Sequence, residues 1–207
     1  MVAEPEVYEY YGGAPAAPPV GVGAPAPDVT VEDARGGPVR LADLWRRGPI
    51  VLVFIRHLGC MFCREHVAHL RDHYAAFQAA GAQVVVIGMG TPTQTRAFIE
   101  AHHLPFPVLS DPIRRSHRAY GVMRGSVQQV SLNPHVWLRG AQTVLGGTFQ
   151  GRAIGDAYQL SGTFIVDRQG IIRFAERAEL SSDFTSADTL LATLATLPGR
   201  KPDHPIA

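Results

Sequence analysis

The sequence contains few cysteines, no long apolar run and no excess of charge of either sign. Its 207 residues include only two cysteines, Cys60 and Cys63, which excludes a framework of several disulfides. The longest apolar run, Ile50–Ile55, has the length of a strand and is far shorter than the ~20 residues of a membrane-spanning helix. With 19 basic and 18 acidic residues, the net charge of +1 provides no basic face for nucleic acid. We therefore expect neither a nucleic-acid partner nor a membrane partner.

The N-terminal segment also lacks the features of a secretory signal. The letters MVAEPEVYEYYGG contain acids where a signal has a basic region, and no apolar stretch follows them. We therefore expect a cytoplasmic protein, in a compartment that keeps thiols reduced. In such a compartment, two cysteines three positions apart indicate a redox or metal site rather than a structural disulfide.

Composition divides the chain into an arm, a domain and a tail. Residues 1–27 are rich in Pro, Ala and Gly, which predicts a flexible arm that folding does not need. Hydrophobic residues make up 46% of the chain and charged residues 18%, enough for one packed domain over residues 28–199. Residues 200–207 are expected to form a short tail. We interpret a segment at about 123–160 as an insert in the domain. The second half of this segment is rich in Gly.

Strands and helices alternate along the expected domain. Apolar, β-branched runs predict buried strands at 50–56 and 83–88, and a β-hairpin within 163–178. This order predicts an α/β fold with a mixed central β-sheet flanked by helices. Apolar spacing and capping residues predict the helices, at 63–80, 93–103, 114–120, 186–197 and in the insert after Asn133-Pro134.

The segment VLVFIRHLGCMFCREHVAHL places Cys60 and Cys63 between a buried strand and a helix. A thiolate at a helix N-terminus meets unpaired N–H groups and the positive end of the helix dipole, which lower its pKa from ~8.5 toward ~7. One thiolate then attacks a peroxide or a disulfide, and the second cysteine closes an intramolecular disulfide that releases the product. By this logic Cys60, the first cysteine, is the favoured nucleophile and Cys63 resolves.

Two other interpretations of the pair stay open from the residues alone. The first is a buried, inert cysteine pair. The second is structural zinc, which needs about four ligands. His57, His66 and His69 lie nearby in the sequence, but there is no second Cys-x-x-Cys. We expect no metal site.

Polar residues beside the motif are candidates for supporting roles. Arg56, at the carboxyl end of the buried strand, and Arg64, on the helix, can each stabilise a thiolate. His57 can accept or donate a proton, and Glu65 can relay one. Each also has a plain structural interpretation, as a surface residue or part of a solvated helix face.

Candidates for substrate contacts lie farther along the chain. Gln159 and Ser161 precede the strand TFIVD, where a loop is expected to approach the dithiol. Arg139 and Arg152 belong to the insert and can bring positive charge to the same place.

Four separated blocks, in the same order, resemble the peroxiredoxin or AhpC/TSA superfamily. They are APDVTVEDARGGPVRLADLW, VLVFIRHLGCMFCREH, VVVIGMGTPTQTRAFIEAHHLPFPVLSDPIRRSHRAYGV and TFIVDRQGIIRFAER. The Cys-x-x-Cys, with GDAYQLSGTFIVD after a long insert, looks most like the peroxiredoxin-like 2 branch, related to selenoprotein U and prostamide/prostaglandin F synthase. The resemblance implies a thioredoxin-like fold and thiol-dependent reduction of peroxides, endoperoxides or disulfides. No organic cofactor is needed, because the electrons reside in the thiols. We expect reduced thioredoxin or a small thiol as the reductant, and a homodimer as one arrangement of the chain.

The chain departs from the standard peroxiredoxin pattern at several positions. Cys60 stands where the family has Thr, and Cys63 stands where the family has the peroxidatic cysteine. This alignment makes Cys63 the nucleophile, whereas the position at the helix start favours Cys60. Arg56 replaces a Pro, and Ser161 stands where an Arg polarises the peroxide, so we expect slow reaction with hydrogen peroxide. Two alternative functions remain: a pathway-specific enzyme acting on a reactive metabolite, and a redox-inactive binding module on the same fold.

Overall fold

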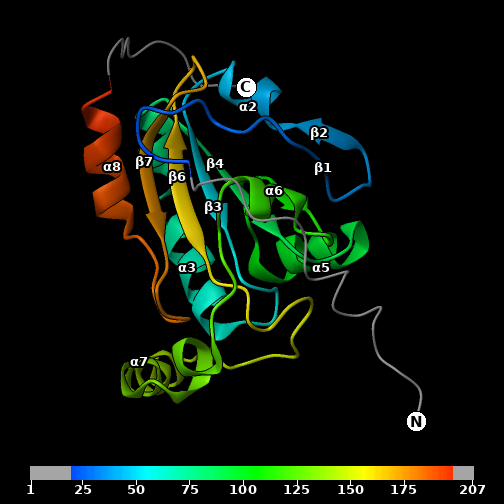
Figure 1. The fold of residues 1–207 in the computed structure, drawn as a ribbon, viewed down its shortest axis with the longest axis vertical. Helices are drawn as coiled ribbons and strands as arrows, with labels where there is room; N and C mark the ends of the chain where they lie inside the picture. The colour runs from blue at the N-terminus through cyan, green and yellow to red at the C-terminus, as the bar shows by residue number, and fades with distance from the viewer. Residues whose placement is uncertain (1–19, 198–207) are drawn as a thin grey trace.

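The computed structural model describes residues 20–197, which fold around one seven-stranded sheet (Figure 1). The strand order is β2-β1-β5-β4-β3-β6-β7. The three middle strands β5, β4 and β3 run parallel, and the pairings outside them are antiparallel. The predicted mixed central sheet is therefore confirmed. The strands are β1 (Thr30–Glu32), β2 (Pro38–Arg40), β3 (Ile50–Phe54), β4 (Gln83–Gly88), β5 (Val108–Ser110), β6 (Gly162–Val166) and β7 (Ile172–Arg177).

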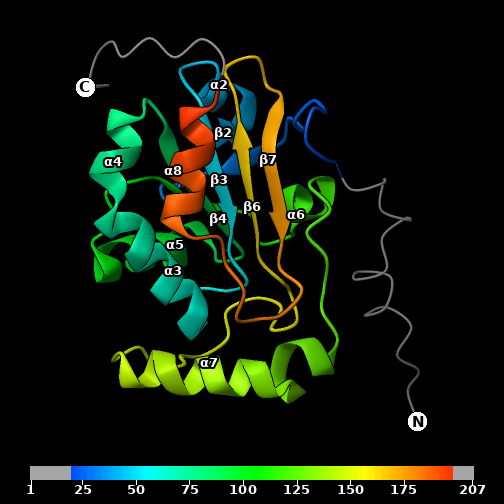
Figure 2. The ribbon, with the colours of Figure 1, turned by 90° about the vertical axis from the view of Figure 1, so that its left-hand side faces the viewer.

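Helices cover both faces of this sheet, so the molecule has three layers (Figures 1 and 2). α3, α4, α5 and α8 supply the apolar side chains on one face, and α2 with the end of α6 covers the other. The helices are α2 (Leu41–Trp45), α3 (Met61–Asp72), α4 (Tyr74–Ala79), α5 (Pro92–His102), α6 (Arg115–Ala119), the π-helix η1 (Gln128–Leu132), α7 (Pro134–Leu145) and α8 (Ala187–Ala195).

β3 lies at the centre because its sequence is apolar on both faces. Every residue of β3 is fully buried. Val51 and Val53 point into the layer that contains α3, whereas Leu52 and Phe54 point into the opposite layer. Each such side chain contributes about 1.5–3 kcal/mol when it is removed from water. This burial fixes the end of β3, from which the Cys-x-x-Cys loop begins.

Two local features differ from the expected elements. The helix expected over residues 63–80 is divided at His73, where φ is −103° and ψ is 7°. The His69 carbonyl oxygen there has two partners on His73, the backbone N–H (3.3 Å) and the ring Nδ1 (2.9 Å). The insert contains η1 as well as the expected α7, and α7 lies across one end of the molecule (Figure 2).

Residues 20–27, the last part of the expected arm, run along the edge of β7. The Gly23 N–H donates to the Ile172 carbonyl (2.8 Å), and the Ile172 N–H donates to the Ala24 carbonyl (3.0 Å). The Ala26 N–H donates to the Gly170 carbonyl (2.7 Å). Residues 1–19 of the arm, and residues 198–207 with the tail, lie outside the described residues. Within residues 20–197, no helix combines the length and the hydropathy needed to cross a membrane.

The contacts of residues 20–27 predict a measurable contribution to stability. A variant that starts at Asp28 should have a lower free energy of unfolding than one that starts at Val20. The difference should be about 2–4 kcal/mol, because three backbone hydrogen bonds to residues 170–172 are lost at ~0.5–1.5 kcal/mol each. Urea denaturation of the two variants, followed by circular dichroism, measures it. Equal midpoints would show that this segment contributes no stability.

Candidate active site

Both cysteines lie at the start of α3. Cys60 has an extended backbone (φ −70°, ψ 124°) and is the residue that precedes the first helical turn, whereas Cys63 lies within that turn. The chain turns sharply before them, with the Cys60 N–H donating to the His57 carbonyl (3.0 Å). Both cysteines are free thiols, and they are 0% and 4% exposed. The pair is therefore reduced, adjacent to free helical N–H groups and shielded from solvent.

Arg56 contacts both thiols from the end of β3. Its Nη1 lies 3.4 Å from the Cys60 Sγ, and its backbone N–H donates to the Cys63 Sγ (3.3 Å). The other nitrogens of the guanidinium donate to the Gln159 carbonyl (Nε, 2.8 Å) and to the Ala157 carbonyl (Nη2, 2.7 Å). Because Arg56 is only 5% exposed, its charge acts on Cys60 with little screening by water.

The two thiols differ in acidity. A hydrogen bond from the Cys63 thiol, the charge of Arg56 and the N–H groups of Cys63 and Phe62 outweigh burial and lower the pKa of Cys60 to about 6. Burial, together with the hydrogen bond to Cys60 and the negative charge there, raises the pKa of Cys63 well above its usual value. These surroundings favour ionisation of Cys60 over ionisation of Cys63.

His57 lies beside the dithiol but is not protonated at neutral pH. Burial, and then the charges of Arg56 and Arg64, lower its pKa to about 4. The buried Nδ1 has no hydrogen-bond partner, and among residues 20–197 no hydrogen bond joins the ring to either thiol. A neutral imidazole with an unused nitrogen can accept a proton only after the surrounding groups move.

Gln159 and Ser161 do not play equivalent parts. The backbone carbonyl of Gln159 holds Arg56, and its side-chain amide donates to the carbonyls of Val122 and Met123. The geometry therefore makes Gln159 a support for Arg56. The Ser161 hydroxyl donates to the Asp183 carbonyl (3.0 Å), on the β6 side of the loop.

Residues 149–157, which we call the cover, close over the dithiol. The Gly151 N–H donates to the Gly59 carbonyl (2.8 Å), and the Met61 N–H donates to the Gln150 Oε1 (3.2 Å). The fit is tight, because a Cβ at Gly59 would overlap the carbonyl oxygen of Arg152. Glycine at position 59 therefore allows two backbones to approach each other directly beside Cys60.

Arg64 and Glu65 connect α3 to the insert rather than to the sulfurs. Arg64 donates to the carbonyls of Leu58 (Nε, 3.4 Å) and Phe149 (Nη1, 3.3 Å), so it ties the cover to the start of α3. Glu65 accepts a hydrogen bond from the Thr143 hydroxyl (2.8 Å) and lies 3.7 Å from Arg139, which places α7. Arg139 is therefore next to Glu65, and its guanidinium lies over the Phe184 ring, 5.8 Å from the ring centroid.

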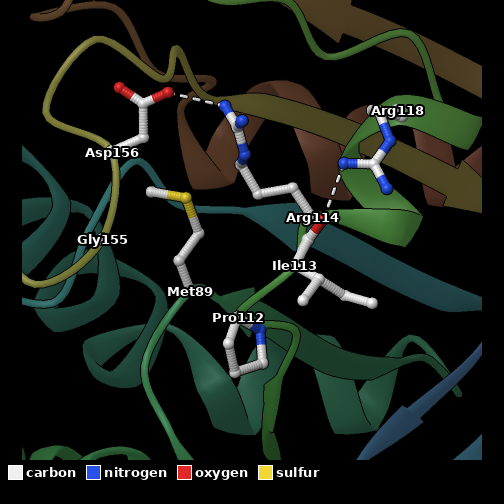
Figure 3. A pocket seen from close by; sticks show the side chains of 7 residues that line it. All are labelled: Met89, Pro112, Ile113, Arg114, Arg118, Gly155 and Asp156. Atoms are coloured by element: carbon white, nitrogen blue, oxygen red, sulfur yellow. Dashed lines mark hydrogen bonds and ion pairs between the residues drawn. The ribbon is translucent and has the colours of Figure 1, made fainter. Parts of the chain in front are cut away.

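A buried ion pair holds the other end of the cover. Figure 3 shows the Asp156 carboxylate directed at Arg114, at an Nη1–Oδ2 distance of 2.6 Å. Burial raises the pKa of Asp156, but hydrogen bonds from Arg124 and the Tyr158 N–H keep this pKa below its usual value. The pair borders a pocket of about 370 Å³, to which Met89, Ile113 and other residues contribute. Sequence reasoning missed this pair, because Arg114 and Asp156 are 42 positions apart and belong to no motif.

His117 and Asp111 support the end of β3 from the opposite layer and were also missed. The His117 Nε2 lies 3.4 Å from the Ile55 carbonyl, and its Nδ1 lies 3.7 Å from the Asp111 Oδ2. Burial raises the pKa of Asp111, but the nearby His117 ring and the hydrogen bonds from Ser116 lower it to about 2 overall. The only sequence signal for these residues was their place in a block shared with a known superfamily.

Among residues 20–197, no group of three His, Cys, Asp or Glu side chains is arranged to hold a metal ion. The histidines of α3 have other contacts. His66 stacks on Phe184 at 4.7 Å between ring centroids, and the His69 Nε2 accepts from the Ala187 N–H (3.3 Å). These rings pack against the segment that leads into α8.

Comparison with known proteins gives a consistent result. A sequence model described as the AhpC/TSA family matches residues 22–175. Peroxiredoxin-like 2C of Homo sapiens is 28% identical over 192 residues, covering 86% of this chain and 83% of that protein. Alkyl hydroperoxide reductase E of Mycobacterium tuberculosis is 31% identical over 155 residues, covering 75% of this chain and 84% of that protein. The crystal structure of peroxidoxin BcpB from Mycobacterium tuberculosis superposes with a TM-score of 0.65 at 25% identity, covering 86% of this chain and 98% of that one.

The geometry predicts that Arg56 controls the acidity of Cys60. In Arg56→Met, the pKa of Cys60 should rise from about 6 by about 1–3, because a neighbouring positive charge favours the thiolate by that amount. The pH dependence of alkylation by iodoacetamide measures this pKa. Arg168→Met is the control, since the exposed Arg168 donates to the Arg47 carbonyl and contacts neither sulfur. A similar change in both variants would contradict a specific role for Arg56.

The close approach at Gly59 predicts the effect of opening the cover. In Gly59→Ala, the new methyl group would overlap the Arg152 carbonyl, so the cover must move away from the thiols. Cys60 should then be alkylated faster than in the wild type at the same pH. Gly21→Ala is the control, because a Cβ there has no neighbour within 4 Å. An unchanged alkylation rate would mean that the cover does not limit access.

Proposed function

Because the chain belongs to the AhpC/TSA family of peroxiredoxin-type thiol oxidoreductases, we propose that it reduces peroxides through a Cys60–Cys63 dithiol. Cys60 is the nucleophile and Cys63 the resolving cysteine. Peroxides, endoperoxides or disulfides are the substrate class, and a thioredoxin-type protein or a small thiol recycles the disulfide. The observation that supports this most directly is the contact of Arg56 with the Cys60 sulfur (3.4 Å).

This contact matters because the thiolate, not the thiol, attacks the peroxide. With a pKa of about 6, Cys60 is mainly a thiolate at pH 7. Cys63 keeps its proton under the same conditions, because burial and the neighbouring thiolate raise its pKa. The contact of the Arg56 guanidinium with the Cys60 sulfur, and the position of Cys60 at the start of α3, support Cys60 as the attacking sulfur over the reverse assignment that the family alignment suggests.

In the first step, the Cys60 sulfur attacks the outer oxygen of the peroxide. The S–O bond forms, the O–O bond breaks, and the alcohol leaves after it takes up one proton. Cys60 is oxidised by two electrons to a sulfenic acid, and the peroxide is reduced by two. Arg56 is placed to stabilise the charge that develops on the oxygens, a role that the family gives to an Arg where this chain has Ser161.

In the second step, Cys63 resolves the intermediate. Its sulfur attacks the Cys60 sulfur, the S–O bond breaks, and water leaves with the proton that Cys63 releases. The resulting Cys60–Cys63 disulfide takes two electrons from an external dithiol or from two small thiols, and the cycle closes. Both cysteines are on one helical turn, so the resolving step needs no second subunit.

The burial of the thiols restricts which reactants reach them. With Cys60 at 0% exposure, substrate and reductant enter only after the cover moves. A redox-inactive binding module would have no use for a lowered cysteine pKa and a buried cation beside it, so the dithiol chemistry is favoured over that alternative.

Cysteine variants test the assignment of roles. One equivalent of cumene hydroperoxide should convert the wild type to a species lighter by two hydrogen atoms in intact-mass spectrometry. Cys63→Ser should instead gain one oxygen and react with dimedone, because the sulfenic acid on Cys60 has no resolving partner. Cys60→Ser should react much more slowly, since the remaining thiol is protonated. A Cys60→Ser variant that consumes peroxide at the wild-type rate would overturn the assignment.

A further inference from the structure

Exposed apolar side chains are concentrated in the insert. Eleven large apolar residues within the described part of the chain are exposed, and nine of them lie between residues 123 and 158. In α7, Trp137 is 65% exposed, Leu138 59% and Leu145 88%. A monomeric protein rarely leaves a contiguous apolar patch of this size in water.

The exposed residues of α7 form one stripe. Its members are three or four positions apart, which places them on one side of a helix. All are apolar and exposed, and we call them the α7 face: Pro134, Trp137, Leu138, Ala141, Val144 and Leu145. The opposite side of α7 packs on the protein through Val136 and Gly140, where a Cβ would lie 2.9 Å from the Met61 side chain. A helix that is apolar on both sides is normally buried on both sides.

The α7 face carries no charge. Arg139, the one charged residue of α7, lies off the stripe beside Glu65 (3.7 Å) and Phe184 (5.8 Å from guanidinium to ring centroid). Helices that lie on anionic membranes carry basic residues along their polar side, and α7 has no such row. An uncharged stripe can pair with an identical stripe without repulsion, as a twofold interface requires.

The area of the face fits a stable dimer. Trp137 alone can bury about 150–250 Å², so the six apolar side chains of the α7 face supply a large part of the ~800 Å² per partner of a stable interface. Trp and Leu without charges are typical of the centre of homodimer interfaces, which are more apolar than transient ones.

We propose that the α7 face binds the α7 face of a second copy of this chain, with the two helices packed side by side about a twofold axis. Figure 2 shows α7 across one end of the molecule, where its outer side is open to a partner. The interface continues onto the cover, because Phe149 follows α7 and is 63% exposed while its carbonyl accepts from Arg64. Dimerisation therefore also holds the cover closed over Cys60.

Sedimentation equilibrium of the full chain tests the interface. The wild type should have twice the mass of one chain at about 10 µM, and Leu145→Glu should weaken dimerisation at least ~100-fold, since both copies bury a charge. Leu138→Glu should have the same effect, and circular dichroism checks that each variant is folded. Val22→Glu, at a residue 67% exposed outside the insert, is the control and should remain dimeric. A monomeric wild type at about 100 µM, or a dimer that both α7 variants leave intact, would overturn the proposal.

The effect on the cover has its own readout, which does not depend on peroxide reduction. Cys60 in the Leu145→Glu monomer should be alkylated by iodoacetamide several times faster than in the wild-type dimer. Dilution of the wild type below its dissociation constant should give the same increase. Equal rates in dimer and monomer would overturn the link between the interface and the cover.

Discussion

The buried guanidinium of Arg56 connects the sheet, the dithiol and the insert. A cation that is only 5% exposed is costly to bury unless its donors are satisfied. Here the Cys60 sulfur and the carbonyls of Ala157 and Gln159 satisfy them. The same group therefore stabilises negative charge on Cys60 and holds the residues that end the cover. Loss of either set of partners leaves a buried charge incompletely paired, so the acidity of the thiol and the position of the cover are physically coupled.

The start of α3 contributes the second part of the site. Extended backbone at Cys60 leaves the N–H groups of the first helical turn directed at its sulfur, and they lower its pKa together with the Cys63 thiol and Arg56. Cys63, one turn later, keeps its proton, because burial and the neighbouring Cys60 raise its pKa. Two identical side chains three positions apart thus acquire different chemistry from their surroundings alone.

The insert turns an accessible helix start into an enclosed one. Arg64 and the Gln150 side chain hold the cover at one end, and the ion pair between Asp156 and Arg114 holds it at the other. α7 is fixed on α3 by Thr143 and Glu65, with an apolar outer side. Enclosure strengthens the electrostatic effect of Arg56 on Cys60, but it also requires movement before any reactant can enter.

Local sequence signals determined the framework. Apolar β-branched runs such as Ile50–Phe54 predicted the central strands, and Cys-x-x-Cys after such a run predicted a dithiol at a helix start, because these patterns depend on neighbouring residues. The partners of the site were decided by tertiary structure. Arg56 meets Gln159 across 103 positions, and Arg114 meets Asp156 across 42, and no periodicity encodes contacts of that range. Glu65 illustrates the same limit, since its place beside the motif suggested a proton relay, whereas packing of the insert directs it to Thr143. Sequence identifies which groups can react; the folding of the insert over the sheet edge decides which of them meet, because burial and charge at the dithiol arise from residues distant in the chain.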